Sequence, residues 1–187
     1  MISRMKGLRW AIALSTMCGV GTGLARADIA SVTVVGVYSN VAVTDAHASG
    51  YRIELWREAD HYFGFFIAAV GPTAELPAGT LDDLRVDPTT QALTFKAKLS
   101  IGRSTMDGEH WVPSRDIYRF EGVLSPDQIT GMLIHADALT TDRPAQSETI
   151  KLYRAKDEES ALAQPATYDQ WWTDVAQEVL EAHGPKW

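Results

Sequence analysis

Short segments in which apolar and polar residues alternate recur from residue 31 to residue 154. Because the side chains of a strand point to opposite faces in turn, a period of two predicts β-strands with one buried face. The clearest example is 93–101, with five apolar residues interleaved by four polar ones. The pattern predicts eight strands over 31–43, 51–57, 62–70, 80–86, 93–101, 115–124, 129–135 and 148–154.

The connections between these segments are short. The turns Glu58–His61, Asp87–Thr90 and Ser125–Gln128 span four residues each, whereas parallel strands need a dozen or more connecting residues. The sequence therefore predicts a mainly β fold, an eight-stranded antiparallel meander that closes into a barrel and so removes its edges. A β-sandwich of two four-stranded sheets would show the same alternation and is the alternative fold.

The segment 62–70 is apolar on both faces, with Phe63, Phe65 and Ile67 on one side. In the preceding segment 51–57, Arg52, Glu54 and Trp56 share a face. A strand that is apolar on both sides is covered on both sides. We therefore expect another element to pack outside the sheet at this point.

The C-terminal region has a different period. Thr167 and Gln170 have the spacing of a capping box, and apolar residues then recur every three or four positions at Tyr168, Trp171, Trp172, Val175, Val179 and Leu180. This pattern predicts an amphipathic helix that ends near Gly184. Residues 156–187 are expected to be a linker and a helix that packs on the outer face of 62–70; a partner-binding helix is the alternative.

The first 27 residues have the form of a secretory signal peptide. Arg4, Lys6 and Arg9 precede an apolar stretch over 10–20, and Ala25-Arg26-Ala27 is a small-x-small cleavage site. Cleavage after Ala27 predicts a periplasmic or secreted protein whose barrel domain covers 28–155. It would also remove Cys18, the only cysteine of the chain, and leave no membrane span.

The acidic balance limits the partners. The predicted leader holds four of the 17 basic residues and none of the 24 acidic ones, so the remaining chain carries a net charge of −11. Such a surface disfavours nucleic acids and anionic membranes.

An eight-stranded meander followed by one helix, in an exported chain, resembles the calycin barrels and the lipocalins in particular. Lipocalins carry Gly-x-Trp in the first strand, where this chain has Gly36-Val37-Tyr38, and a basic residue at the end of the last strand, where it has Arg154. Their middle Thr-Asp-Tyr motif is absent, although Asp116-Ile117-Tyr118 is faintly similar. The resemblance implies a cup-shaped cavity for a small apolar ligand, and no catalysis.

Motifs for catalysis or metal binding are weak. The five histidines form no His-x-His or His-x3-His pair, and no Gly-x-Ser-x-Gly elbow or phosphate-binding glycine loop is present. We therefore predict no catalytic residues, no metal site and no cofactor; a hydrolase of unrecognised type is a remote alternative.

Ligand binding inside the barrel is the leading hypothesis, because ligand sites are mostly apolar with a few placed polar groups. The candidates are aromatic residues of several strands, with Arg52, Trp56 or Arg119 as polar groups if their face turns inward; the aromatic set is Phe63, Phe65, Phe95, Tyr118 and Phe120. The same rings could instead fill the barrel as plain core.

The third hypothesis is a protein-binding module, such as a periplasmic inhibitor, that acts through the loop 102–114. The composition of this loop suits an interface hot spot, with Arg103, Met106, His110 and Trp111 in it and Arg115 next to it.

Overall fold

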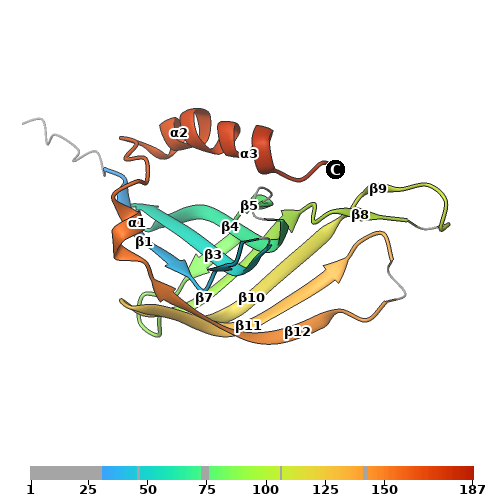
Figure 1. The fold of residues 1–187 in the computed structure, drawn as a ribbon. Helices are drawn as coiled ribbons and strands as arrows, with labels where there is room; N and C mark the ends of the chain where they lie inside the picture. The colour runs from blue at the N-terminus through green and yellow to red at the C-terminus, as the bar shows by residue number, and fades with distance from the viewer. Residues whose placement is uncertain (1–30, 46, 73–75, 106, 141–142) are drawn as a thin grey trace, which may run out of the picture.

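A computed structural model of the chain describes residues 31–45, 47–72, 76–105, 107–140 and 143–187. The predicted signal peptide over 1–27 lies outside these residues, and so does Met106 of the proposed binding loop. The described chain forms an antiparallel barrel with a helix lying across one outer face (Figure 1).

The barrel wall is one continuous sheet. Its strands are β1 (Thr33–Ser39), β2 (Ala42–Val43), β3 (His47–Glu58), β4 (His61–Pro72), β5 (Ala78–Thr80), β6 (Asp82–Val86), β7 (Ala92–Leu99), β10 (Asp116–Leu124), β11 (Gln128–Asp137) and β12 (Gln146–Arg154). Nine of them follow one another in the order β5, β4, β3, β1, β12, β11, β10, β7 and β6, and β2 also pairs with β3. All these pairings are antiparallel.

The two ends of this path are consecutive in the chain. β5 pairs with β4 and β6 pairs with β7, while Leu81 lies between them and donates its backbone N–H to the carbonyl of Gly64 at 3.0 Å. The sheet is therefore nearly closed on itself. This single path confirms the predicted barrel over the sandwich.

All eight predicted strands are present, and two of them are divided. The segment 31–43 forms β1 and β2, with the pairing register shifting between Val34 and Gly36. The segment 80–86 is split around Leu81 because its halves pair with different neighbours. The predicted loop 102–114 contains a small hairpin, β8 (Arg103–Ser104) and β9 (Val112–Pro113), which projects from the barrel (Figure 1).

The barrel interior is a packed core. Its inward-facing side chains form one cluster, and each buried member is at most 8% exposed. Gly122 and Gly131 are direct cross-strand partners, and the ring tip of Phe120 lies over both. A Cβ on either glycine would lie 2.5 or 2.7 Å from Phe120 Cζ, so the glycine pair makes the room that this ring occupies.

The C-terminal helix follows the short helix α1 (Lys156–Glu159) and consists of α2 (Tyr168–Trp171), a π-helical turn over Trp172–Ala176, and α3 (Gln177–His183). Thr167 caps it, since its hydroxyl accepts the backbone N–H of Gln170 at 3.2 Å. The Gln170 side chain accepts the N–H of Ala166 at 2.8 Å instead of that of Thr167. The predicted N-terminal cap is confirmed, with its return bond displaced by one residue.

A second apolar cluster joins this helix to the outer face of β3 and β4. It contains Trp56, Phe63, Phe65, Trp171 and Ala176. The expectation that the helix covers the outer face of 62–70 is therefore confirmed. The sheet wall at β4 is apolar on both sides because one side faces the core and the other faces the helix.

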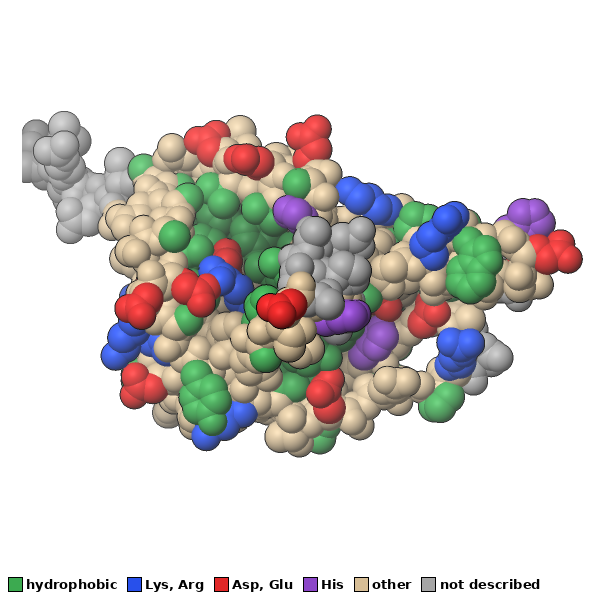
Figure 2. Space-filling view, viewed as in Figure 1, with side chains coloured by type: hydrophobic (Ala, Val, Ile, Leu, Met, Phe, Trp, Pro, Cys, Tyr) green, Lys and Arg blue, Asp and Glu red, His purple; other side chains and the backbone are tan. Residues whose placement is uncertain are grey.

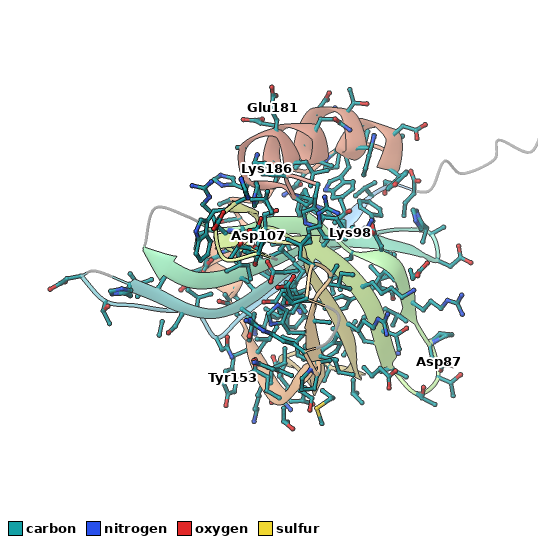
Figure 3. All side chains as sticks on the ribbon, turned by 90° about the vertical axis from the view of Figure 1, so that its right-hand side faces the viewer. Asp87, Lys98, Asp107, Tyr153, Glu181 and Lys186 are labelled. Carbon is teal, nitrogen blue, oxygen red and sulfur yellow. The ribbon has the colours of Figure 1, made fainter. Side chains whose placement is uncertain are left out.

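The last residues of the chain lie against the end of β7. Trp187 donates its indole N–H to the carbonyl of Leu99 at 3.0 Å, and the amide of Lys186 donates to the Ser100 hydroxyl at 3.0 Å. Lys98 lies over the Trp187 ring, with its ammonium 5.1 Å from the ring centroid. Figure 3 shows Lys186 just below the helix. The helix is thus held to the barrel at both ends.

Candidate functional site

The predicted ligand-binding residues divide into three places. Phe95, Tyr118 and Phe120 lie inside the barrel and are at most 3% exposed. Phe95 stacks on Phe120 with centroids 5.1 Å apart, and Tyr118 contacts Phe66 at 5.1 Å. Burial raises the pKa of the Tyr118 hydroxyl. These rings contact one another within a closely packed core.

A buried carboxylate lies beside this core. Asp116 is 5% exposed and accepts the backbone N–H of Ile101 at 2.8 Å. It also accepts the hydroxyl of Ser114 at 2.5 Å, and its other oxygen lies 2.7 Å from His135 Nε2. With three partners the buried oxygens are satisfied, so this cluster fastens the base of the β8–β9 hairpin to β11.

Trp56, Phe63 and Phe65 lie on the opposite side of the wall. They point outward, and their rings surround Trp171 at centroid distances of 5.7, 4.8 and 5.1 Å. The Trp56 indole donates to the carbonyl of Ala163 at 3.0 Å. The sequence hypothesis grouped these rings with the interior set, but the structure places the sheet between the two groups.

A groove opens beside this outer cluster, between the barrel wall and α3. Its volume is about 510 Å³, which lies within the range of small-molecule sites. Figure 2 shows apolar side chains gathered in a hollow below the helix, with charged side chains at its rim. The apolar side chains that line it come from β2, β4, β5 and α3 and from the residues just before β2 and β5: Val41, Val43, Phe65, Ile67, Leu76, Ala78 and Val179.

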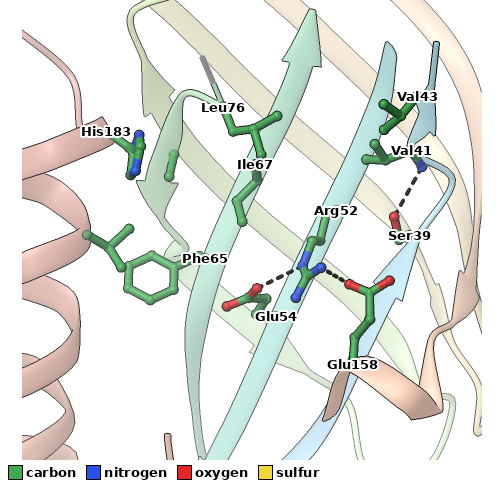
Figure 4. A pocket seen from close by; sticks show the side chains of 12 residues that line it. Ser39, Val41, Val43, Arg52, Glu54, Phe65, Ile67, Leu76, Glu158 and His183 are labelled. Carbon is green, nitrogen blue, oxygen red and sulfur yellow. Dashed lines mark hydrogen bonds and ion pairs between the residues drawn. The ribbon is translucent and has the colours of Figure 1, made fainter. Parts of the chain in front are cut away.

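The polar groups of the groove lie mainly at one end. Arg52 occupies the middle of an ion-pair chain, with its Nε donating to Glu54 Oε1 at 2.8 Å and its Nη1 donating to Glu158 Oε2 (Figure 4). The side chain of Glu54 is 14% exposed and that of Glu158 is 47% exposed. Ser39 lies beside Val41, and His183 lies across the groove on the helix.

Two further contacts hold this end of the groove in place. Arg154 clamps Glu159 through Nε at 2.6 Å and Nη2 at 3.0 Å, which lowers the pKa of the Glu159 carboxyl. Tyr38, the last residue of the Gly36-Val37-Tyr38 segment of β1, is the direct cross-strand partner of Arg154. The clamp fixes α1, and α1 carries Glu158 into the groove.

The sequence hypothesis named only Arg52 and Phe65 among the residues of this groove. It missed Val41, Leu76, Ala78, Val179 and His183, because they come from segments far apart in the chain. The signal that was present is the outward face of 51–57, where Arg52 and Glu54 alternate with buried residues. The expectation that something packs outside 62–70 pointed to the correct face.

Trp111 lies away from both regions, on the projecting hairpin, and is 53% exposed. The turn before it is ordered by Asp107, which accepts the backbone amides of Glu109 and His110 at 3.0 and 2.9 Å. Hydrogen bonds from the amide and ring of His110 lower the pKa of Asp107. Arg103 Nη2 donates to the carbonyl of Trp111 at 2.6 Å, so the exposed ring stands on a folded support.

Among the described residues, no group of three or more metal-ligating side chains comes together. No helix in the described part of the chain is long and apolar enough to cross a bilayer. Comparisons with protein-family models, curated proteins and solved structures find no match for this chain.

Proposed function

We propose that this protein is a non-enzymatic binding protein that takes up a small, mainly apolar molecule in the groove between its C-terminal helix and its barrel wall. The observation that carries the proposal is the hollow itself. Its apolar walls and its few polar groups at one end are the usual composition of a small-molecule site.

The proposal moves the ligand from the barrel interior to the outer face. The interior rings of Phe95, Tyr118 and Phe120 are buried against one another. This favours a barrel filled by its own side chains, which was one of the two alternatives that remained open from the sequence. The groove supplies accessible apolar surface instead, with Val43 69% and Leu76 38% exposed. A ligand there would bury surface that water now covers, and this burial is the main driving force for apolar binding.

Export is part of the proposal and is supported by the leader pattern of residues 1–27. A lipocalin-like relationship is likewise proposed, supported by the barrel, the C-terminal helix and the pairing of Tyr38 with Arg154. An exported carrier of a poorly soluble molecule is the role that best unites these features. Because fold alone does not determine function, the experiment below tests binding in the groove and not the likeness of the fold.

The first experiment titrates the purified protein with Nile red, an uncharged apolar dye whose fluorescence rises in an apolar site. The decisive variant is Val179→Trp, which fills the groove from α3. Its matched control is Glu178→Trp, which places the same side chain at the exposed neighbouring position. We expect dye binding to be lost only in Val179→Trp. Equal binding by both variants would overturn the groove as the site.

A second candidate function is protein binding through the β8–β9 hairpin. The observation that favours it is Trp111, an exposed aromatic residue on an internally bonded hairpin. The hairpin projects from the barrel (Figure 1). Aromatic residues presented in this way are typical anchors of protein interfaces.

The hairpin is tested by replacing Trp111 with Ala in the full chain and comparing proteins captured from the periplasm of the native host. We expect a partner retained by the wild type to be lost from Trp111→Ala, while Trp172→Ala retains it. The unchanged melting temperature of Trp111→Ala would show that the barrel is intact. Identical capture by all three proteins would exclude the hairpin as the interface.

A further inference from the structure

We infer that the ligand of the groove carries a positively charged group, so that the protein selects amphipathic amines over fatty acids of the same length. The inference rests on the proposed function, since it concerns the polar end of the same groove. It names the class of molecule that the groove would take.

The charge balance of the groove is the first step. Arg52 is the only permanently positive side chain among the described lining residues, and it faces two carboxylates. Because Glu54 and Glu158 together outweigh Arg52, the polar end carries one net negative charge. A cationic group is attracted to such a site, and a carboxylate is repelled from it.

The hydrogen-bond geometry gives the second step. Glu54 binds Arg52 through Oε1 and Glu158 binds it through Oε2. Among the hydrogen bonds of the described residues, the second oxygen of each carboxylate is not engaged. An ammonium group could donate hydrogen bonds to both of these oxygens without separating the existing pairs, and hydrogen bonds from a cationic donor to a carboxylate are strong.

An anionic ligand would face the opposite situation. It could reach the Arg52 guanidinium only by displacing Glu54 or Glu158, and the displaced carboxylate would lose its partner. Removing one partner from a partly buried ion pair is costly, and the Glu54 side chain is 14% exposed. The groove is thus preorganised against anions.

The apolar side chains of the groove would contact the hydrocarbon part of such a ligand. Phe65 lies between Glu54 and α3 (Figure 4), and Ile67 and Val179 line the same groove. A chain attached to the ammonium group would lie along these side chains. Molecules of this shape have a charged head and one apolar body, and the groove offers one surface for each.

The test compares decylamine, which is protonated at pH 7 and keeps three N–H donors, with decanol and decanoate, each below its micellar concentration, as competitors of Nile red. We expect decylammonium to bind about tenfold more tightly than decanoate, a ratio that corresponds to about 1.4 kcal/mol, with decanol between them. Tighter binding of decanoate, or equal binding of all three, would overturn the charge selection while leaving the groove in place. Failure of all three to displace a bound dye, or absence of dye binding, would instead refute the proposed function.

Variants at the carboxylates sharpen the result. Glu158→Gln should reduce the preference for the cation several-fold, because it removes one charge from the groove. Asp157→Asn is the matched control, since it makes the same charge change on the preceding residue of α1, which does not line the groove. Arg52→Gln should increase the preference for the cation. A preference unchanged by both Glu158→Gln and Arg52→Gln would overturn the inference.

Discussion

The two halves of the C-terminal helix meet the same barrel wall in different ways. In the first half, Trp171 and Ala176 are at most 1% exposed and pack against a set of aromatic rings. In the second half, α3 has no buried residue and borders the groove instead. The difference shows how one helix can be both a structural clamp and the wall of a binding site.

The cause lies in the side chains that the wall presents. Under the first half, Trp56, Phe63 and Phe65 project far enough to fill the space below the helix. Under the second half, Ile67 and Ala78 are shorter, and a hollow remains above them. The π-helical turn over Trp172–Ala176 ends the first half, directly before α3; such turns are frequent at functional sites.

The largest expected effect comes from Trp171→Ala. Removing this fully buried ring leaves a cavity among Trp56, Phe63 and Phe65, so we expect the free energy of unfolding to fall by about 3–5 kcal/mol. Urea denaturation measures the loss. The matched control is Trp172→Ala, whose ring is 39% exposed and which should cost less than about 1 kcal/mol. Equal losses would mean that the two faces of the helix are not distinguished as the structure indicates.

A smaller effect is expected from Glu159→Gln, which releases the clamp that holds α1 and the polar end of the groove. Losing a bidentate, partly buried ion pair should cost about 1–2 kcal/mol at pH 7.

The pH dependence of this loss has a definite sign. The pKa of Glu159 is lower in the folded protein than in the unfolded chain because Arg154 stabilises the carboxylate. Its contribution is therefore present above the unfolded pKa of about 4.3 and is lost as the pH falls through the folded value. Urea midpoints of wild type and Glu159→Gln should differ at pH 7, and the difference should shrink progressively as the pH falls below the unfolded pKa of about 4.3. A difference that persists at acidic pH would contradict the ion-pair explanation.

The helix itself and its location could be predicted from the sequence. The Thr167 cap, the three- and four-residue spacing and the double-sided apolar strand 62–70 are all local signals, and each has a direct structural counterpart. The strand pattern was equally informative because residues such as Leu93 and Leu99 alternate with exposed lysines. These elements depend on neighbours within a few positions.

The groove could not be predicted in the same way. Where a strand is apolar on both faces, alternation shows that Phe63 and Phe65 share a side but does not show which side is inside. The sequence therefore could not show whether Phe63 and Phe65 face the barrel interior together with Phe95 and Tyr118. Leu76, Ala78 and Val179 meet only because the sheet curls and the helix returns across it.

The next largest loss of stability is expected from a variant at the beginning of the helix. Thr167→Ala removes the hydroxyl that accepts the Gln170 amide at 3.2 Å, and loss of such a cap should cost about 1 kcal/mol. Thr167→Ser keeps the oxygen and is the control. Chemical denaturation of the two variants should separate them, and an unstable Thr167→Ser would point to a role of the methyl group instead of the cap.

The smallest effect on stability is expected from Val179→Ala, and it tests the second half of the helix. This side chain borders the hollow and is only partly buried, so its truncation should lower the free energy of unfolding by less than about 1 kcal/mol. Nile red binding should nevertheless weaken several-fold, because each apolar group removed from a ligand contact is worth about 0.8 kcal/mol. Val175→Ala is the matched control: Val175 is also partly buried against the outer cluster, but it does not line the groove. We expect Val175→Ala to have a similarly small effect on stability and to leave dye binding unchanged. Equal weakening of dye binding by the two variants would show that the groove is not the site of the dye, because only Val179 borders it.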